Sequence, residues 1–321
     1  MKYRRLGSTE RPVSVVGIGT WQFGGEWGRD YQVHEVRAIL ERARELGINL
    51  LDTAECYGDH VSERLIGEAI EGRRDEWFVA TKFGHRYTGD FQRDQLWSAD
   101  EVLRQLDASL EALRTDHVDL YQFHHIDRES PWDEIWQAIE VLVGAGKVLY
   151  AGSSNFAGWH IAEANEAARA RHFLGLVSEQ CKYNLLVRSV ELEVLPACER
   201  YGLGVIPYSP LAGGVLGGAL QKASEGRRSG EQAQKDIERL RPQLEAWETQ
   251  CAEMGERPAD VALAWLLHNP VVTAPIIGPR NVEQLDGTLR ALEIELSDEA
   301  LARLDELFPG PGGPGPEAWA W

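Results

Sequence analysis

The sequence predicts an α/β protein folded as a single (β/α)₈ barrel, and two observations support this prediction. Short apolar, β-branched runs alternate with amphipathic stretches whose apolar residues recur at helical spacing. The runs return about every 30 residues, which is the length of one strand–helix unit. A chain of 321 residues with eight such units has the size of one large barrel.

The elements are expected in regular order. Strands are predicted at 13–19, 48–54, 77–82, 118–125, 148–154, 176–180, 203–210 and 272–278. Helices are predicted at 32–46, 62–70, 98–113, 131–143, directly after 154, at 189–201 and at 281–293. Ser62 and Ser98 carry side chains typical of helix N-caps, and Gly47 and Gly144 stand where helices should stop.

The segments outside this pattern have their own signals. Residues 2–6 are expected as a short strand that closes the barrel bottom as part of an N-terminal hairpin. The polar stretch 217–242 is interpreted as a flexible loop on the catalytic face. The tail 308–321 should be irregular because it is rich in Pro and Gly, and the tryptophans at its end are expected to dock elsewhere on the barrel.

A doubly wound dinucleotide-binding sheet is the rival fold. It requires the turn G-x-G-x-x-G after the first strand, followed at once by a helix. The segment Gly17–Gly25 reads GIGTWQFGG, which lacks the third glycine at the required place and opens no helix. The Rossmann interpretation is therefore rejected.

The charge balance excludes some partners. The formal net charge is −18, which repels nucleic acid and anionic lipid. The four cysteines form no C-x-x-C pair, which argues against a disulfide framework or a structural zinc site. No apolar run is long enough for a membrane span and the N-terminus has no apolar leader, so a cytoplasmic location is expected.

Polar residues stand where the predicted strands end. Side chains at the carboxyl ends of barrel strands face the active site. The residues at these ends are Asp52, Tyr57, Lys82, His124, Ser154, Asn155, Gln180, Tyr208 and Arg280. Taken singly, Asp52 could be a helix cap, Lys82 a solvated rim lysine and His124 a hydrogen-bonded core histidine. Together they indicate catalysis.

Carbonyl reduction would explain this combination. Hydride goes to carbon and a proton must reach oxygen, and Tyr57 is the candidate donor. Bringing a phenol from a pKa of about 10 to about 7 takes roughly 4 kcal/mol, which one nearby cation can supply. Lys82 is that cation, and Asp52 would hold it while cancelling part of its charge. His124 would orient the carbonyl oxygen and help to relay the proton.

The motifs around these residues resemble those of the aldo-keto reductases. The resemblance rests on LDTAECYG (51–58), ATKFG (80–84), DLYQFHH (119–125), AGSSNF (151–156), IPYSPLAGG (206–214) and IIGPRNVEQL (276–285). It covers nearly the whole chain in the same order. It implies a (β/α)₈ barrel, hydride transfer from a reduced nicotinamide, no metal, and a catalytic tetrad of Asp52, Tyr57, Lys82 and His124.

The resemblance also implies the cofactor contacts. Ser154, Asn155 and Gln180 would hold the nicotinamide carboxamide, and Tyr208 would stack on its ring. Arg280 would meet the 2′-phosphate of adenosine, which favours NADPH over NADH. The full predicted set is Gly19, Thr20, Trp21, Asp52, Ser154, Asn155, Gln180, Tyr208, Ser209, Pro210, Leu211, Gly213, Gly278, Arg280, Gln284 and Thr288. Val282 and Thr288 depart from the residues that the family often carries there, which weakens the expected adenine contacts.

The small-molecule carbonyl substrate is less well defined. The residues predicted to line its pocket are Trp21, Trp27, Tyr87 and His125. Such a pocket suits a flat or apolar carbonyl compound, or a sugar ring. The alternatives are a keto-sugar or sugar-nucleotide reductase, and a cofactor-binding regulatory subunit like the beta subunits of potassium channels. A glycosidase using Glu55 and Glu179 would leave Lys82 unexplained.

Overall fold

The structure is a computed structural model, and it describes residues 1–26, 28–87, 91–93, 97–221 and 230–312. Three expectations fall partly or wholly outside this range. They are the substrate-pocket residue Trp27, residues 222–229 of the loop expected at 217–242, and the tail from residue 313 onward with its tryptophans.

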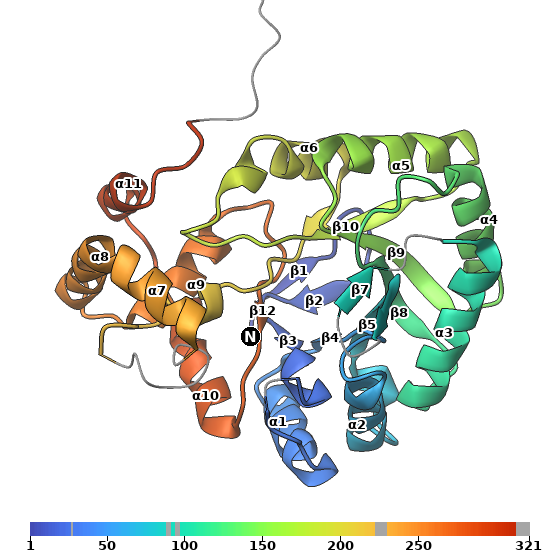
Figure 1. Ribbon diagram of the computed structural model, residues 1–321, viewed down its shortest axis with the longest axis horizontal. Helices are drawn as coiled ribbons and strands as arrows, with labels where there is room; N and C mark the ends of the chain where they lie inside the picture. Colours follow the sequence, from blue (N-terminus) through green and yellow to red (C-terminus); the bar gives the residue numbers. More distant parts are fainter. Residues whose placement is uncertain (27, 88–90, 94–96, 222–229, 313–321) are drawn as a thin grey trace, which may run out of the picture.

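Eight parallel strands curl into a barrel (Figure 1), which confirms the predicted fold class. They are β3 (Gly17–Gly19), β4 (Leu50–Asp52), β5 (Phe78–Phe83), β8 (Val118–Phe123), β9 (Val148–Ser154), β10 (Leu176–Gln180), β11 (Gly204–Val205) and β12 (Ile276–Ile277). The order in the sheet is β11-β10-β9-β8-β5-β4-β3-β12. A parallel bridge from Val205 in β11 to Val272, which precedes β12, and a backbone hydrogen bond from Ile276 in β12 to Pro207 at 2.8 Å close the ring.

Helices surround the sheet. The helices that follow the strands are α1 (Val33–Glu45), α2 (Val61–Ala69), α3 (Ala99–Leu113), α4 (Trp132–Gly144), α5 (Gly158–Ala170), α6 (Val194–Tyr201), α9 (Pro258–His268) and α10 (Val282–Gly287). Three more, α7 (Glu231–Arg239), α8 (Arg241–Glu253) and α11 (Asp298–Leu307), lie together on one flank (Figure 1). Among the residues that the structure describes, no helix is long and apolar enough to cross a bilayer.

The N-terminal hairpin is present and closes the barrel bottom. It pairs β1 (Tyr3–Arg5) antiparallel with β2 (Pro12–Ser14). Leu6 and Val13 are buried in the cluster that fills this end of the barrel. The Arg4 guanidinium donates hydrogen bonds to the carbonyl oxygens of Val272 and, at 2.8 Å, Leu267. The single strand expected at 13–19 is therefore wrong, because its first residues belong to the hairpin and only Gly17–Gly19 enters the barrel.

Several element boundaries differ from the prediction. Ser62 is not an N-cap: α2 begins after His60, and the Ser62 hydroxyl instead donates to the carbonyl oxygen of Thr20 at 3.0 Å. Ser98 is the predicted cap and accepts a hydrogen bond from the Glu101 backbone at 3.3 Å. The helices expected at 189–201 and 281–293 are each divided into a 3₁₀ turn and an α-helix.

The stretch 217–242 holds helix α7 and the start of α8, so the described part of it beyond residue 229 is not a loop. Ile237 is buried, and Lys235 pairs with Glu231 one turn earlier at 2.6 Å. These are the apolar contact and the i, i+4 pair that stabilise a surface helix. The loop prediction was based on the polar composition of the segment, which did not indicate a helix.

Candidate active site

Strand alternation explains how the predicted residues meet. Leu50, Phe78, Ala80 and Leu120 point into the barrel, where they form part of its lower core. Two residues further along each strand, the same side of the backbone carries a polar group. Asp52, Lys82 and Gln122 therefore lie above the apolar layer, and His124 follows on the end of β8. The sequence places apolar residues at the bottom of the barrel and polar residues at the top.

Lys82 is the centre of the site. Its side chain is fully buried, and the ammonium donates to Asp52 Oδ2 at 2.8 Å and to the carbonyl oxygen of Thr53 at 2.8 Å. A third hydrogen bond, at 3.2 Å, reaches the hydroxyl oxygen of Tyr57. All the donors of this buried ammonium therefore have acceptors, which burial of a charge requires.

The second carboxylate oxygen of Asp52 is also hydrogen-bonded. Oδ1 accepts hydrogen bonds from the side-chain amides of Gln180 at 2.7 Å and Gln122 at 3.2 Å. Gln180 thus contacts a catalytic candidate directly, besides lining the cavity. Gln122 was not singled out from the sequence, although its place two residues before His124 on the inward face of β8 would have indicated it.

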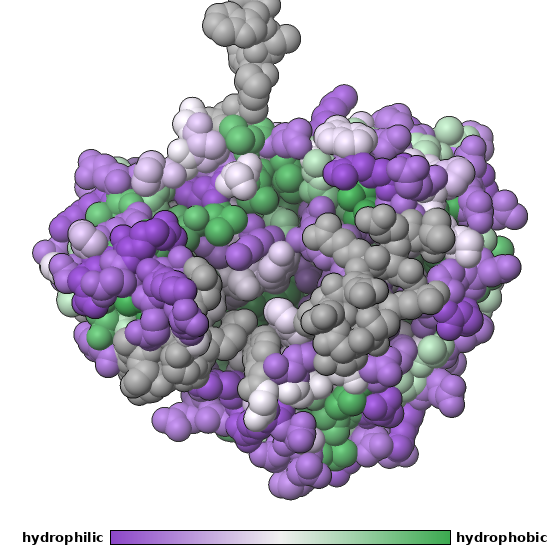
Figure 2. Space-filling model, viewed as in Figure 1, coloured by the Kyte–Doolittle hydropathy of each residue, from purple (hydrophilic) through white to green (hydrophobic). Residues whose placement is uncertain are grey.

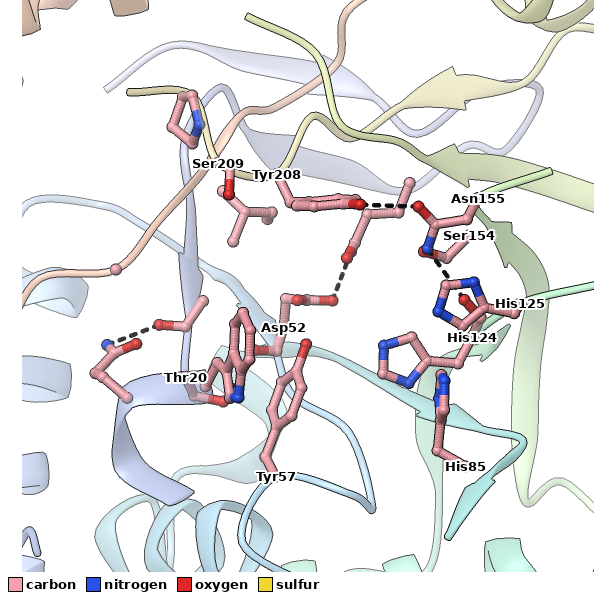
Figure 3. Close-up of a pocket in the computed structure, with 17 residues that line it drawn as sticks. Thr20, Asp52, Tyr57, His85, His124, His125, Ser154, Asn155, Tyr208 and Ser209 are labelled. Atoms are coloured by element: carbon pink, nitrogen blue, oxygen red, sulfur yellow. Dashed lines mark hydrogen bonds between the residues drawn. The ribbon is translucent and has the colours of Figure 1, made fainter. Parts of the chain in front are cut away.

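Tyr57 stands on a tight turn between β4 and α2. The next residue, Gly58, has φ +63°, and a Cβ there would lie 2.1 Å from the carbonyl oxygen of Gly24. Only glycine fits so close an approach. The Tyr57 ring stacks on Trp21 with ring centroids 5.9 Å apart. Figure 3 shows the hydroxyl of Tyr57 pointing into the space between Asp52 and His124.

Burial raises the pKa of Tyr57 well above its usual range, and the negative charge of Asp52 raises it further. The prediction that Lys82 lowers the Tyr57 pKa is therefore wrong. Burial is the main reason, and the pairing of Lys82 with Asp52 at 2.8 Å means that Tyr57 also meets an ion pair rather than an isolated cation. The phenol keeps its proton, and Lys82 stands ready to hydrogen-bond a phenolate.

His124 lies across the site from Tyr57, with the two ring centroids 6.0 Å apart. Its pKa is lowered well below the usual range, first by burial and then by the charges of His85 and Lys82. The imidazole is therefore neutral and carries one N–H. His85 was missed by the sequence reasoning, although it follows the end of β5 and its ring centroid lies 4.2 Å from that of His124.

These residues surround a cavity of about 450 Å³. Figure 2 shows a hollow near the middle of this face, within a mostly hydrophilic rim. The lining residues are Gly19, Thr20, Trp21, Gln22, Asp52, Tyr57, His85, His124, His125, Ser154, Asn155, Gln180, Tyr208, Ser209, Pro210, Ile276 and Gly278. Gln22, His85 and Ile276 are additions to the predicted set, while Lys82 lies beneath the floor.

Asn155 connects the residues of the wall opposite Tyr57 by hydrogen bonds. Its backbone is left-handed, with φ +60°. The side-chain amide donates to Ser154 Oγ at 2.9 Å and to the carbonyl oxygen of His124 at 3.2 Å. Its oxygen accepts a hydrogen bond from the Tyr208 hydroxyl at 2.9 Å (Figure 3). Three predicted cofactor residues, Ser154, Asn155 and Tyr208, thus form one hydrogen-bonded unit beside His124.

Five predicted cofactor residues do not line this cavity: Leu211, Gly213, Arg280, Gln284 and Thr288. Leu211 and Gly213 lie in or beside the 3₁₀ turn Ala212–Gly214, next to Pro210. Arg280 is exposed, and its backbone N–H donates to the side chain of Gln284 at 2.9 Å. Thr288 donates to the carbonyl oxygen of Leu285 at 2.7 Å. Of the predicted substrate pocket, Trp21 and His125 line the cavity, whereas Trp27 and the side chain of Tyr87 lie outside the described structure.

Comparison with known proteins adds the family. Residues 15–308 match the model of the Aldo/keto reductase family. The uncharacterized oxidoreductase YrpG of Bacillus subtilis is 48% identical over the full length of both chains. The norsolorinic acid reductase stcV of Emericella nidulans is 36% identical over 92% of this chain and 79% of its own. A putative voltage-gated potassium channel subunit beta of Schizosaccharomyces pombe is 31% identical over 95% and 93%. The chain therefore belongs to the aldo/keto reductase family.

Proposed function

We propose that this protein reduces aldehydes or ketones to alcohols with NADPH, and that Tyr57 is the proton donor. The observation that carries the proposal is the buried Lys82 ammonium, which joins Asp52 to the Tyr57 hydroxyl at the floor of the cavity. Four buried, free cysteines suit the reducing cytoplasm that we propose as its location.

The residues present fit a nicotinamide cofactor. Asn155 and Ser154 offer amide and hydroxyl groups beside the tetrad, and Tyr208 offers an aromatic ring on the same wall. Further out, Gly213 has a positive φ and open space around its Cα, so its backbone can approach a phosphate closely. The exposed Arg280 supplies a cation for the 2′-phosphate. Bound NADPH would supply the hydride.

The geometry supports the proposed proton transfer. The O–H bond of Tyr57 breaks as a bond forms between its proton and the substrate oxygen. The phenolate that remains is stabilised by the Lys82 ammonium, 3.2 Å away. Asp52 holds that ammonium in place, and the neutral His124 donates its N–H to the same substrate oxygen. Donors aimed at the developing negative charge are the strongest contribution that such a site makes.

Two alternatives draw on particular relatives. One relative is named as a reductase of norsolorinic acid, and the Trp21 wall of this cavity suits a flat carbonyl compound. A keto-sugar could stack on the same ring. The relative named as a potassium channel subunit favours a regulatory role, in which the site would bind the cofactor and turn over slowly.

The test is to follow NADPH oxidation across aldehydes, quinones, steroids and keto-sugars with the wild type and Tyr57→Phe. We expect turnover of at least one class by the wild type, and a loss of about 100- to 10,000-fold in the variant, because the proton donor is gone. Quenching of tryptophan fluorescence by NADPH should be kept, which separates chemistry from binding. Retained turnover in Tyr57→Phe would disprove the proposed acid, and NADPH binding without turnover of any carbonyl would favour the regulatory role.

A further inference from the structure

A cluster of sulfur and nitrogen ligands adjoins the proposed tetrad and shares His124 with it, whereas its other two members have no part in the proposed reduction. It consists of Cys56, His85 and His124. Among the described residues, these three offer metal-ligand atoms that all lie within 4.8 Å of one another. We propose that this cluster is a Zn²⁺ site, and that Zn²⁺ bound there inhibits the enzyme.

The spacing fits the ion. The distance from Cys56 Sγ to His124 Nδ1 is 3.6 Å. A tetrahedral zinc with a Zn–S bond of about 2.3 Å and a Zn–N bond of about 2.0–2.1 Å separates sulfur and nitrogen by about 3.5 Å. The His85 and His124 rings meet edge to face with centroids 4.2 Å apart, and the ligand atoms of all three residues lie within 4.8 Å of one another.

The ligand types narrow the choice of ion. One thiolate and two imidazoles form a borderline-soft set that favours Zn²⁺ over Mg²⁺ or Ca²⁺, which prefer oxygen ligands. Three protein ligands leave the fourth position open to water or to a carbonyl oxygen. Formation of the Zn–S bond releases the thiol proton to solvent, and no electron is transferred.

The surroundings allow the ion to enter. His85 and His124 both line the cavity, and Cys56 is buried just behind His124. The backbone of His85 donates a hydrogen bond to Glu55 Oε1 at 3.0 Å, which fixes the chain at this ligand and sets a carboxyl group beside it.

Inhibition follows from the role of His124. A zinc ion on Nδ1 fixes the imidazole in one orientation, so that its remaining N–H can no longer turn to follow the substrate oxygen. This consequence rests on the proposed reductase function, whereas binding of the ion does not.

The experiment uses the untagged full-length chain, with Co²⁺ as a spectroscopic probe and Zn²⁺ as competitor. In the wild type we expect one Co²⁺ per chain, a thiolate-to-cobalt charge-transfer band, and loss of that band on addition of Zn²⁺. Cys56→Ala should abolish the band, and Cys56→Ser serves if the alanine variant does not fold. The matched control is Cys251→Ala, which removes another buried cysteine and should keep the band.

Activity gives the second measurement. Micromolar Zn²⁺ should inhibit NADPH-dependent reduction in the wild type and in Cys251→Ala, and Mg²⁺ should not. Cys56→Ala should raise the half-inhibitory Zn²⁺ concentration at least tenfold while it leaves the uninhibited rate near that of the wild type. Absence of the cobalt band in the wild type, or its survival in both Cys56 variants, would overturn the site. If the band is present but Zn²⁺ leaves a working reductase unaffected, the inhibition is disproved.

Discussion

Lys82 combines full burial with a positive charge, and the structure accounts for both. The ammonium has three acceptors in Asp52, Thr53 and Tyr57, and the first of these carries a compensating charge. Such a pair is costly to desolvate, so it contributes little to stability compared with apolar packing. The proposed reaction would explain its presence at the cavity floor, because a phenolate that forms briefly on Tyr57 would need a cation already in place.

Lys82→Met should therefore damage both activity and stability. We expect the rate of carbonyl reduction to fall about 100-fold or more, because the phenolate loses its cation. Stability should fall by about 3–5 kcal/mol, since Asp52 is left buried without its partner. Urea unfolding and NADPH oxidation measure the two effects. In the double variant Lys82→Met/Asp52→Asn, stability should partly return and activity should not; recovery of activity would refute the role of the pair.

We propose that a single residue, Arg280, sets the preference for NADPH over NADH. Its guanidinium is exposed beyond the cavity, and none of the described residues forms an ion pair with it. We expect Arg280→Met to raise the Kd for NADPH about 10- to 100-fold, because a charge-assisted contact to the 2′-phosphate is lost. The Kd for NADH, which lacks that phosphate, should stay within about twofold. Fluorescence titration measures both. Arg290→Met is the matched control, because that arginine is already paired with Glu256 and Glu293. Equal weakening of both cofactors would contradict the 2′-phosphate contact.

At the scale of elements, the turn that carries Tyr57 is tied to the start of α2. His60 precedes the helix with φ +64°, and its Nδ1 lies 2.5 Å from Glu63 Oε2. Glu63 is fully buried and its other oxygen accepts a hydrogen bond from Thr81 on β5 at 2.6 Å. The hydrogen bond to Glu63 raises the pKa of His60. The turn is thus linked to the strand that bears Lys82.

This link predicts a pH-dependent stability. A histidine whose pKa is raised by folding stabilises the folded state fully below its unfolded pKa of about 6.5, and loses that contribution as pH rises through the folded value. The wild type should therefore exceed His60→Asn by on the order of 1–2 kcal/mol at about pH 6, and the gap should close by about pH 9. Asparagine tolerates the left-handed backbone, so it leaves the turn intact. Urea unfolding across this pH range is the measurement, and a constant gap would contradict the titration of His60.

At the scale of the whole molecule, the barrel separates a stabilising end from a reactive one. The bottom is filled by apolar side chains and covered by the hairpin, whereas the top carries the tetrad and the cavity. Barrels commonly divide in this way, because loops at the carboxyl ends of strands can vary without disturbing the core.

Leu6→Ala tests this division. Leu6 is fully buried at the barrel bottom, so its truncation should cost about 2–5 kcal/mol. Thermal unfolding measures the loss. The values of kcat and KM, measured well below the new melting temperature, should stay within about twofold of the wild type, because the site lies at the other end. Leu174→Ala, at a leucine that is 58% exposed, is the control and should be nearly neutral. A change in KM with Leu6→Ala would show that the two ends are coupled.

The sequence by itself determined the architecture and indicated which residues would meet at the proposed tetrad. The period of about 30 residues predicts strand–helix units, because each strand must be covered by a helix of similar length. Asp52, Lys82 and His124 could be placed together because barrel strands all present their carboxyl ends at one face. Tyr57 could be added from its position after β4. These predictions depend on local sequence patterns, which can be recognised without knowing the tertiary contacts.

Only the tertiary structure decided the rest. The sheet register sets Lys82 beneath the floor between Asp52 and Tyr57. Burial of Tyr57, and then the negative charge of Asp52, raises the Tyr57 pKa instead of lowering it. His85 becomes part of the site through the packing of its ring on His124, and Cys56 through a contact with the same ring. Pairing, burial and desolvation depend on groups that lie far apart in the chain, so they are fixed only when the barrel closes.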